Sequence, residues 1–297
     1  MRRFRAGVTR AVAVLGLGVC SVAVAGQDAA ADEGDISGPG GAGWYVSLAA
    51  GASASSDLKQ AGRNRDDTCY PDDDCGHLTG GRPTGYRWFY DLHAASGTAV
   101  ELAVGRFFGD TRIEVGLMQR RSAVAQAFTG ITYLDGSPLV PATDSAYESM
   151  SNASTDDLTV RSLSVNVYRD FPLAYGITPY LGAGVGMSWA ELSGIHYEGR
   201  YRCSPGVPCD NPGQYDGLQH IDLSETVPSG HVHAGLDVDL GRGILIGLKL
   251  SYNRVGDIDG SHGYSEHKVP GLTSYTRISD IERWSLLVGA KYLLDGG

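Results

Sequence analysis

The chain has 297 residues, a formal net charge of −10, 42 glycines and 16 tyrosines. No basic stretch is present to neutralise phosphates, which excludes nucleic acid as a partner. After residue 26, no segment approaches the ~18 consecutive apolar residues of a transmembrane helix, so a membrane location would require a closed β-barrel.

The first 25 residues have the order of a secretory signal peptide. A basic start with four arginines precedes an apolar run over 11–19, which is too short to span a bilayer. Ala23-Val24-Ala25 offers a small-x-small cleavage site, and a second site follows Ala31. Cys20 follows Val19, which is not the small residue that a lipoprotein signal requires. We therefore expect a signal peptide (1–25), a disordered lead-in (26–42) and one barrel domain (43–297).

Eight stretches after the lead-in alternate apolar residues with small or polar residues. This period of two predicts strands with two different faces. In the third stretch, for example, Ile113 and Val115 lie on one face, and Arg112 and Glu114 lie on the other. In chain order the predicted strands are 43–53, 98–108, 111–121, 159–171, 179–192, 230–240, 244–254 and 281–294.

The connections between these strands alternate between short and long. Short turns follow the second, fourth and sixth strands, and long polar segments follow the first, third, fifth and seventh. This alternation is typical of outer-membrane barrels, which have short periplasmic turns and long outer loops. We predict an all-β fold, an eight-stranded antiparallel up-and-down transmembrane β-barrel with four long extracellular loops. The long segments are 54–97, 122–158, 193–229 and 255–280.

The assignment of faces decides between a membrane barrel and a soluble one. In a secreted soluble sandwich or lipocalin-like barrel, the large apolar side chains would point inward. Here the opposite face carries charges of both signs among many glycines, and these side chains suit the filled lumen of an eight-stranded barrel. Large aromatic residues near the strand ends of the apolar face suit interfacial girdles. The predicted lumen charge network is Glu101, Arg112, Glu114, Asp237, Asp239, Lys249 and Lys291.

Four cysteines remain in the mature chain, in two close pairs. An even number of cysteines in a secreted chain predicts disulfides. Local pairing of Cys69 with Cys75 and of Cys203 with Cys209 is favoured, because each pair brackets a proline-containing turn. A zinc site is the alternative, but no histidine lies at ligand spacing beside either pair.

Two stretches resemble a known family of barrels. Glu101-Leu-Ala-Val-Gly105 with Arg112-Ile-Glu114, and Asn166-Val-Tyr-Arg-Asp-Phe171 with Thr178-Pro-Tyr-Leu-Gly-Ala-Gly-Val-Gly186, resemble strands two to five of OmpA-like and surface-antigen barrel domains. The resemblance covers about residues 43–294. It implies an eight-stranded outer-membrane barrel acting as a surface antigen, adhesin or envelope-stabilising protein without catalytic residues.

The sequence departs from this family in two ways. The family's last strand usually ends on a phenylalanine, whereas Tyr292-Leu-Leu294 is followed here by Asp295-Gly-Gly297. The peptidoglycan-binding domain of full-length members has no counterpart after the eighth strand, so wall anchoring is not expected.

Motifs for catalysis are missing from the sequence. No Gly-x-Ser-x-Gly, phosphate-loop or zinc signature occurs. A lipid-A-modifying site would need groups near the outer rim, where His231, His233, Ser188 and Glu191 are candidates, but a hydrogen-bonded lumen network is favoured. Two acidic stretches, Asp72-Asp73-Asp74 and Asp257 to Asp259, have the chemistry but not the spacing of a calcium loop.

Two aromatic clusters lie in the predicted loops. Tyr86 to Tyr90 and Tyr197 to Tyr201 would either extend the hairpins beyond the membrane or contact a partner, with structural packing the more frequent role.

These observations predict a non-enzymatic integral protein of the bacterial outer membrane. We expect a role as a surface antigen, or in adhesion or the envelope, through the outer loops. The expected partners are outer-membrane lipid and lipopolysaccharide and an extracellular or host-surface ligand, and we expect a monomer without cofactor or metal. A narrow porin-like conduit is the alternative, and a lipid-A-modifying enzyme is the third.

Overall fold

The computed structural model describes residues 43–79, 83–143 and 145–294. The predicted signal peptide and lead-in lie outside the described residues. Helical structure in the described part consists of three short segments, α1 (Gly76–Thr79), η1 (Ala174–Gly176) and η2 (Pro212–Tyr215). None of the described helices is long and apolar enough to cross a membrane.

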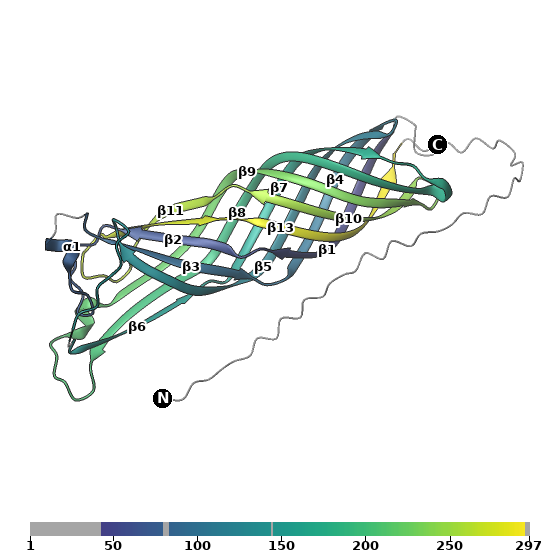
Figure 1. Cartoon of the computed structure of the whole chain (residues 1–297). Helices are drawn as coiled ribbons and strands as arrows, with labels where there is room; N and C mark the ends of the chain where they lie inside the picture. The colour runs from purple at the N-terminus through teal and green to yellow at the C-terminus, as the bar shows by residue number, and fades with distance from the viewer. Residues whose placement is uncertain (1–42, 80–82, 144, 295–297) are drawn as a thin grey trace, which may run out of the picture. The chain divides into compact units, whose positions relative to one another are not determined.

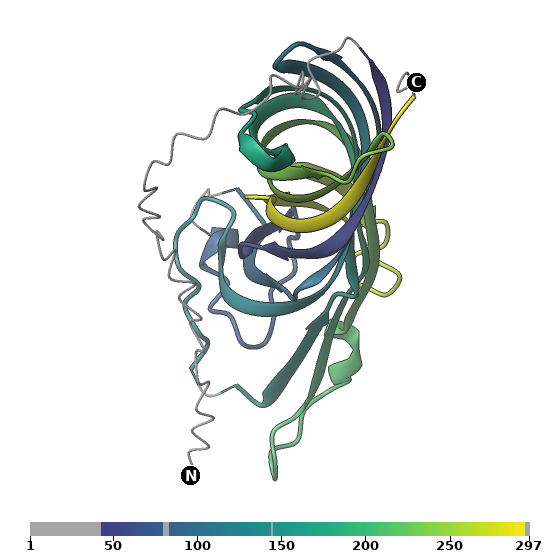
Figure 2. The same ribbon diagram turned by 90° about the vertical axis from the view of Figure 1, so that its right-hand side faces the viewer.

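Eight antiparallel strands form a closed ring (Figures 1 and 2). Each strand pairs with the next one in the ring, and the first pairs with the last, so the ring has no open edge. The predicted eight-stranded up-and-down topology is therefore confirmed. The ring consists of β1 (Trp44–Ser55), β4 (Gly97–Phe108), β5 (Thr111–Tyr133), β7 (Asp157–Asp170), β8 (Ile177–Cys203), β9 (Gly217–Asp239), β10 (Ile244–Val255) and β13 (Glu282–Leu293).

Short turns join the strands at one end of the ring, as predicted. The β4–β5 turn places Gly109 at φ 63°, and the β9–β10 turn places Gly241 and Gly243 at φ 76° and 73°. Glycine adopts these left-handed conformations without the steric cost that a Cβ imposes. The turn chemistry of the sequence therefore fixes the register at this end.

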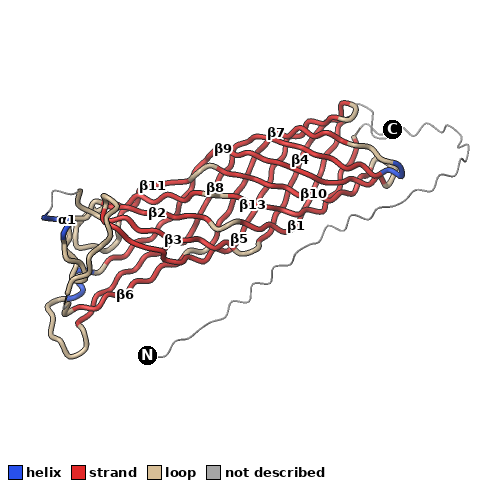
Figure 3. Tube along the Cα trace, viewed as in Figure 1, coloured by secondary structure: helices blue, strands red, loops and turns tan. Residues whose placement is uncertain are grey.

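The four long connections contain more regular structure than their polar sequences predict. β5, β8 and β9 continue well beyond the ring, and Figure 3 shows strands reaching most of the way to the outer end. These additions form an outer extension with strand orders β11-β12-β2-β3-β5 and β6-β8-β9. The short strands of the extension are β2 (Leu58–Asn64), β3 (Tyr86–Ala94), β6 (Tyr147–Ser154), β11 (Ile258–Gly263) and β12 (Thr273–Ser279).

The polarity of the wall reverses between the ring and the outer extension. Around the ring, large apolar side chains such as Leu102 (55% exposed) and Val165 (49% exposed) point outward, while Glu114 and Lys249 are buried inside. In the extension, charged side chains point outward and a cluster of apolar residues fills the interior. A wall that is apolar outside and polar inside suits lipid, and the reverse suits water. The level at which the pattern reverses therefore marks the outer surface of the membrane.

The apolar cluster of the extension lies above the polar lumen. Its members are fully or nearly fully buried and come from nine strands and from the connection between β12 and β13. Since water is excluded from a packed apolar layer, this cluster seals the outer end of the lumen. It comprises Leu58, Leu92, Val124, Leu158, Val160, Ala190, Leu192, Ile195, Ile221, Leu223, Val227, Val255, Ile258, Ile278 and Ile281.

Candidate functional site: lumen network and outer cleft

Charged side chains inside the ring form two connected groups. In the first, Lys249 Nζ lies 2.6 Å from Glu101 Oε1 and 3.3 Å from Glu114 Oε1. The hydroxyls of Tyr45 and Tyr168 each donate to Glu114 at 2.8 Å. These contacts satisfy both oxygens of a carboxylate that is almost wholly buried.

The second lumen group surrounds Asp237. Arg112 Nη1 lies 2.9 Å from Asp237 Oδ2, and Lys291 pairs with the other oxygen. Arg112 Nη2 also lies 3.4 Å from Asp170 Oδ1, and Asp170 is not among the predicted network residues. The structure thus brings six of the seven predicted network residues together.

Asp239 is not a member of the network, and this part of the prediction is wrong. Its side chain is exposed and accepts a 2.7 Å hydrogen bond from the backbone N–H of Gly241. Asp239 has the inward parity of the strand but is the last residue of β9, where the ring ends and the turn begins. Alternation along the strand therefore predicts the inward face for Asp239 correctly, but it does not show that the residue lies at the end of the strand, outside the lumen.

Glycines opposite the network make room for its large side chains. A Cβ at Gly182 would overlap the ring of Tyr168, and one at Gly184 would overlap the amide of Asn166. The run of glycines in β8 is therefore required by the filling of the lumen.

The groups considered for a hydrolytic site are dispersed. The hydroxyls of Ser188 and Ser162 form a 2.7 Å hydrogen bond. In the pairing of β8 with β9, Ser188 lies opposite Val227, whereas His231 lies opposite Gly184. His231 contacts Ser229, and Glu191 is exposed on the outer wall. Ser188, His231 and Glu191 are thus not in a triad arrangement. His231 and His233 instead belong to a hydrogen-bonded network with Asn253 and Asn166.

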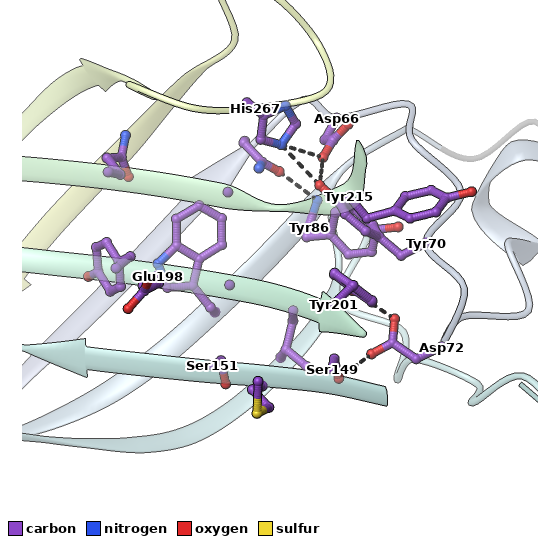
Figure 4. Close-up of a pocket in the computed structure, with 18 of the residues that line it drawn as sticks. Asp66, Tyr70, Asp72, Tyr86, Ser149, Ser151, Glu198, Tyr201, Tyr215 and His267 are labelled. Atoms are coloured by element: carbon purple, nitrogen blue, oxygen red, sulfur yellow. Dashed lines mark hydrogen bonds and ion pairs between the residues drawn. The ribbon is translucent and has the colours of Figure 1, made fainter. Parts of the chain in front are cut away.

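A cleft of about 450 Å³ opens in the outer extension. It lies between β3 and β5 on one side and β6 and β8 on the other. Asp66, Tyr70 and Asp72 also line it (Figure 4). Its wall is dominated by aromatic rings, most of them half-buried. The rings are Tyr70, Tyr86, Trp88, Tyr90, Phe128, Tyr197, Tyr201, Tyr215 and Tyr264.

The two disulfides lie in the outer extension. Cys69 is bonded to Cys75 and Cys203 to Cys209, with Cα–Cα distances of 5.3 and 5.4 Å. The first bridge closes a short loop that carries Asp72 and Asp73 into the cleft wall. Closing this loop reduces the entropy of the unfolded segment and so stabilises the arrangement of the wall.

Asp66 is the most deeply buried acid of the cleft. It accepts hydrogen bonds from the Tyr70 hydroxyl at 2.7 Å and the Thr68 N–H at 2.9 Å, and His267 Nε2 lies 3.3 Å away. Burial alone would raise the pKa of Asp66, but the hydrogen bonds from His267, Tyr70 and Thr68 outweigh it and lower that pKa below its ordinary value. Burial also raises the pKa of Tyr90 and of Tyr264 to about 12, so both rings are neutral phenols at physiological pH.

Replacing Asp66 with alanine is expected to loosen the outer end of the cleft at neutral pH. The change leaves the Thr68 N–H without its acceptor and the Tyr70 hydroxyl with only His267 Nε2, 3.0 Å away, at an expected cost of about 1–3 kcal/mol. Because the folded-state pKa is lowered, this contribution is present above the unfolded pKa of about 4 and is lost as the pH falls through the lowered value. Protease resistance of the outer segments should differ between wild type and variant at pH 7, and a difference that persisted undiminished at pH 2 would contradict the assignment.

The cleft is not apparent from the sequence. Both aromatic clusters and the acidic stretch beside Cys69 are visible there, but their spacing indicates only packing and a candidate calcium loop. Among the described residues, no group of three or more His, Cys, Asp or Glu side chains is arranged to hold a metal ion. Asp257 pairs instead with Arg277, and Asp259 with Tyr275.

The fold defines a class of protein. A closed ring of antiparallel strands with an apolar belt outside, a charged lumen inside and short turns at one end is an outer-membrane β-barrel. The protein is therefore an integral protein of the bacterial outer membrane.

Comparisons with solved structures find barrels of this kind. The chain is similar to Neisserial surface protein A (14% identity, 85% of this chain and 98% of that one, TM-score 0.40). It is also similar to the outer membrane protein OprG from Pseudomonas aeruginosa (14%, 84% and 96%, TM-score 0.41). A third is the outer membrane protease OmpT from Escherichia coli (8%, 87% and 99%, TM-score 0.35). At such identities the similarities concern the fold and say nothing about what this chain binds or catalyses.

No family model and no curated protein sequence matches the chain.

Proposed function

We propose that the protein is a non-enzymatic surface protein that contacts an extracellular ligand or host surface through its outer extension, as the resemblance to OmpA-like and surface-antigen barrels also suggests. The observation that carries the proposal is that the barrel lumen is filled, whereas the outer extension contains an open cleft. The lumen is occupied by paired charges, and the apolar cluster covers its outer end. The cleft opens to the outside and brings polar and aromatic groups together at one place.

The filled lumen argues against a conduit. An aqueous pore requires a continuous wet path, and both the paired lumen charges and the apolar cluster interrupt such a path. We expect the refolded protein to show no stepwise single-channel conductance in planar bilayers. Reproducible steps from the wild-type protein would favour the conduit instead.

The proposal is tested by attachment of cells that carry the protein. Cells displaying the full protein should attach to epithelial monolayers more than cells displaying a variant whose segments 56–96 and 124–156 are replaced by short turns. Both proteins must first show the gel shift on heating that marks a folded barrel. Equal attachment by the two folded proteins would contradict a role for the outer extension, and a change in lipid A dependent on the protein would replace it with an enzymatic one.

A further inference from the structure

We propose that the outer cleft binds a small organic cation with a quaternary ammonium group. The inference deepens the proposed function, since it names the chemistry that the outer extension recognises. It rests on the charge of the cleft, on its aromatic faces and on the state of its hydrogen-bonding groups.

The cleft wall is acidic. Four carboxylates line it, and none of the described lining residues is lysine or arginine. Arg200, just outside, pairs with Glu198 at 2.9 Å, and His267 faces Asp66. Asp72 accepts from uncharged hydroxyl groups, so its negative charge repels anions and favours a cation. The four carboxylates belong to Asp66, Asp72, Asp73 and Glu198.

Aromatic faces surround these carboxylates. Tyr70 stacks on Tyr201 with ring centroids 5.9 Å apart, and Tyr215 lies 5.7 Å from Tyr201 (Figure 4). A cation held over such faces gains about 0.5–2 kcal/mol per contact, and cages of aromatic rings are the usual receptors for quaternary ammonium groups. The chain contains one such contact beside the cleft, where Lys268 Nζ lies 4.5 Å from the ring centre of Tyr215.

Two carboxylates of the cleft are already engaged by neighbouring donors, whereas the indole Nε1 of Trp88 has no hydrogen-bond partner among the described residues. Asp72 accepts from Tyr201 through one oxygen and from Ser149 through the other, both at 2.9 Å. Asp66 is likewise engaged by Tyr70 and Thr68. Sugars and primary amines need free acceptors or donors, whereas a quaternary ammonium group needs only negative potential and polarisable surface. The cleft supplies these two properties.

The cleft also has an entrance. β5 pairs with β7 as far as Ala123, and its outer part pairs with β3 and, at Thr132, forms an isolated bridge with Pro138. β6 pairs with β8 instead of β5, so the two strands diverge (Figures 1 and 2). Phe128 and Met150, both exposed, line the cleft on either side of this divergence. A small molecule can therefore enter from the side without opening the barrel.

The first experiment is isothermal titration calorimetry of choline into the refolded protein. The detergent should be an octyl polyoxyethylene ether, because amine-oxide and phosphocholine detergents carry the competing chemistry. The comparison ligand is 3,3-dimethylbutan-1-ol, which has the shape of choline without its charge. We expect saturable choline binding and at least tenfold weaker binding of the neutral isostere. Equal binding of the two, or no binding of choline to protein that shifts on heating, would overturn the proposal.

Three variants test the residues. Asp72→Asn should weaken choline binding about tenfold, whereas Asp257→Asn, which removes an outer-wall carboxylate paired with Arg277, should leave it unchanged. Tyr201→Phe keeps the ring and releases an oxygen of Asp72, so it should retain binding even if Asp72→Asn fails to fold. Loss of binding in folded Tyr201→Phe, or an equal loss in both aspartate variants, would contradict the site.

A second titration, with glycerophosphocholine, distinguishes a lipid headgroup from free choline as the source of the ligand. Glycerophosphocholine binding as tightly as choline would indicate a lipid headgroup, and binding of choline alone would indicate the free ion; either supports the ammonium site. If neither binds while attachment still depends on the outer extension, the cation site fails and the proposed function stands.

Discussion

The substitution Val165→Arg should lower the free energy of unfolding in lipid bilayers by about 2–4 kcal/mol, because it places a charge on the lipid-facing wall near the middle of the membrane. Val165 is half exposed on the outside of β7 and lies opposite Val115 and Val185 in the neighbouring strands. Urea unfolding of protein refolded into phosphatidylglycerol vesicles measures the change.

The matched control is Ala125→Arg. Ala125 is also an outward, exposed residue of a wall strand, but it lies in the outer extension, where its neighbour on β3 is His93. Since this wall faces water, the change should stay within about 0.5 kcal/mol. Equal losses at the two positions would mean that the polarity reversal does not mark the membrane surface.

A second large effect is expected from Lys249→Met. The change removes the cation that faces both Glu101 and Glu114 and leaves two buried carboxylates without a positive partner. Breaking a buried ion pair in this way typically costs about 3–5 kcal/mol. The free energy of unfolding in the same vesicles should fall by that amount.

A triple variant separates the charge effect from loss of packing. Adding Glu101→Gln and Glu114→Gln to Lys249→Met removes the unpaired charges while keeping the shape of both side chains. We expect the triple variant to recover most of the lost stability. If it is less stable than Lys249→Met, the cost arises from packing around the lysine and not from the charge network.

The ring of the barrel was predictable from the sequence because each strand there separates lipid from a polar lumen. Alternation in β7, with Val165 outward and Asn166 inward, is therefore strict and carries the face assignment with it. The short turns add the topology, since residues such as Gly109 are required where the chain reverses. Because lipid lies on one side of the wall and the polar lumen on the other, apolar and polar residues alternate along each strand.

The outer extension was less predictable because its walls reverse polarity along continuous strands. In β5, the inward residues change from Glu114 in the lumen to Val124 in the apolar cluster. If the inward face is assumed to be polar throughout, the strand appears to end near Arg121, where apolar residues begin to point inward. β5 in fact continues to Tyr133. The cleft was harder to predict than the extension. Its residues Asp72 and Tyr201 are 129 positions apart and meet only because different hairpins pack together.

The most direct test of the membrane assignment is the accessibility of spin labels at single introduced cysteines at Val165 and Ala125 in vesicles. The label at 165 should collide mainly with oxygen, which concentrates in lipid, and the label at 125 mainly with a water-soluble nickel chelate. That pair of results would support a lipid-facing ring beneath a water-facing outer extension. Nickel accessibility at both positions would contradict it, because the apolar belt would then face water and the assignment of a membrane barrel would be wrong.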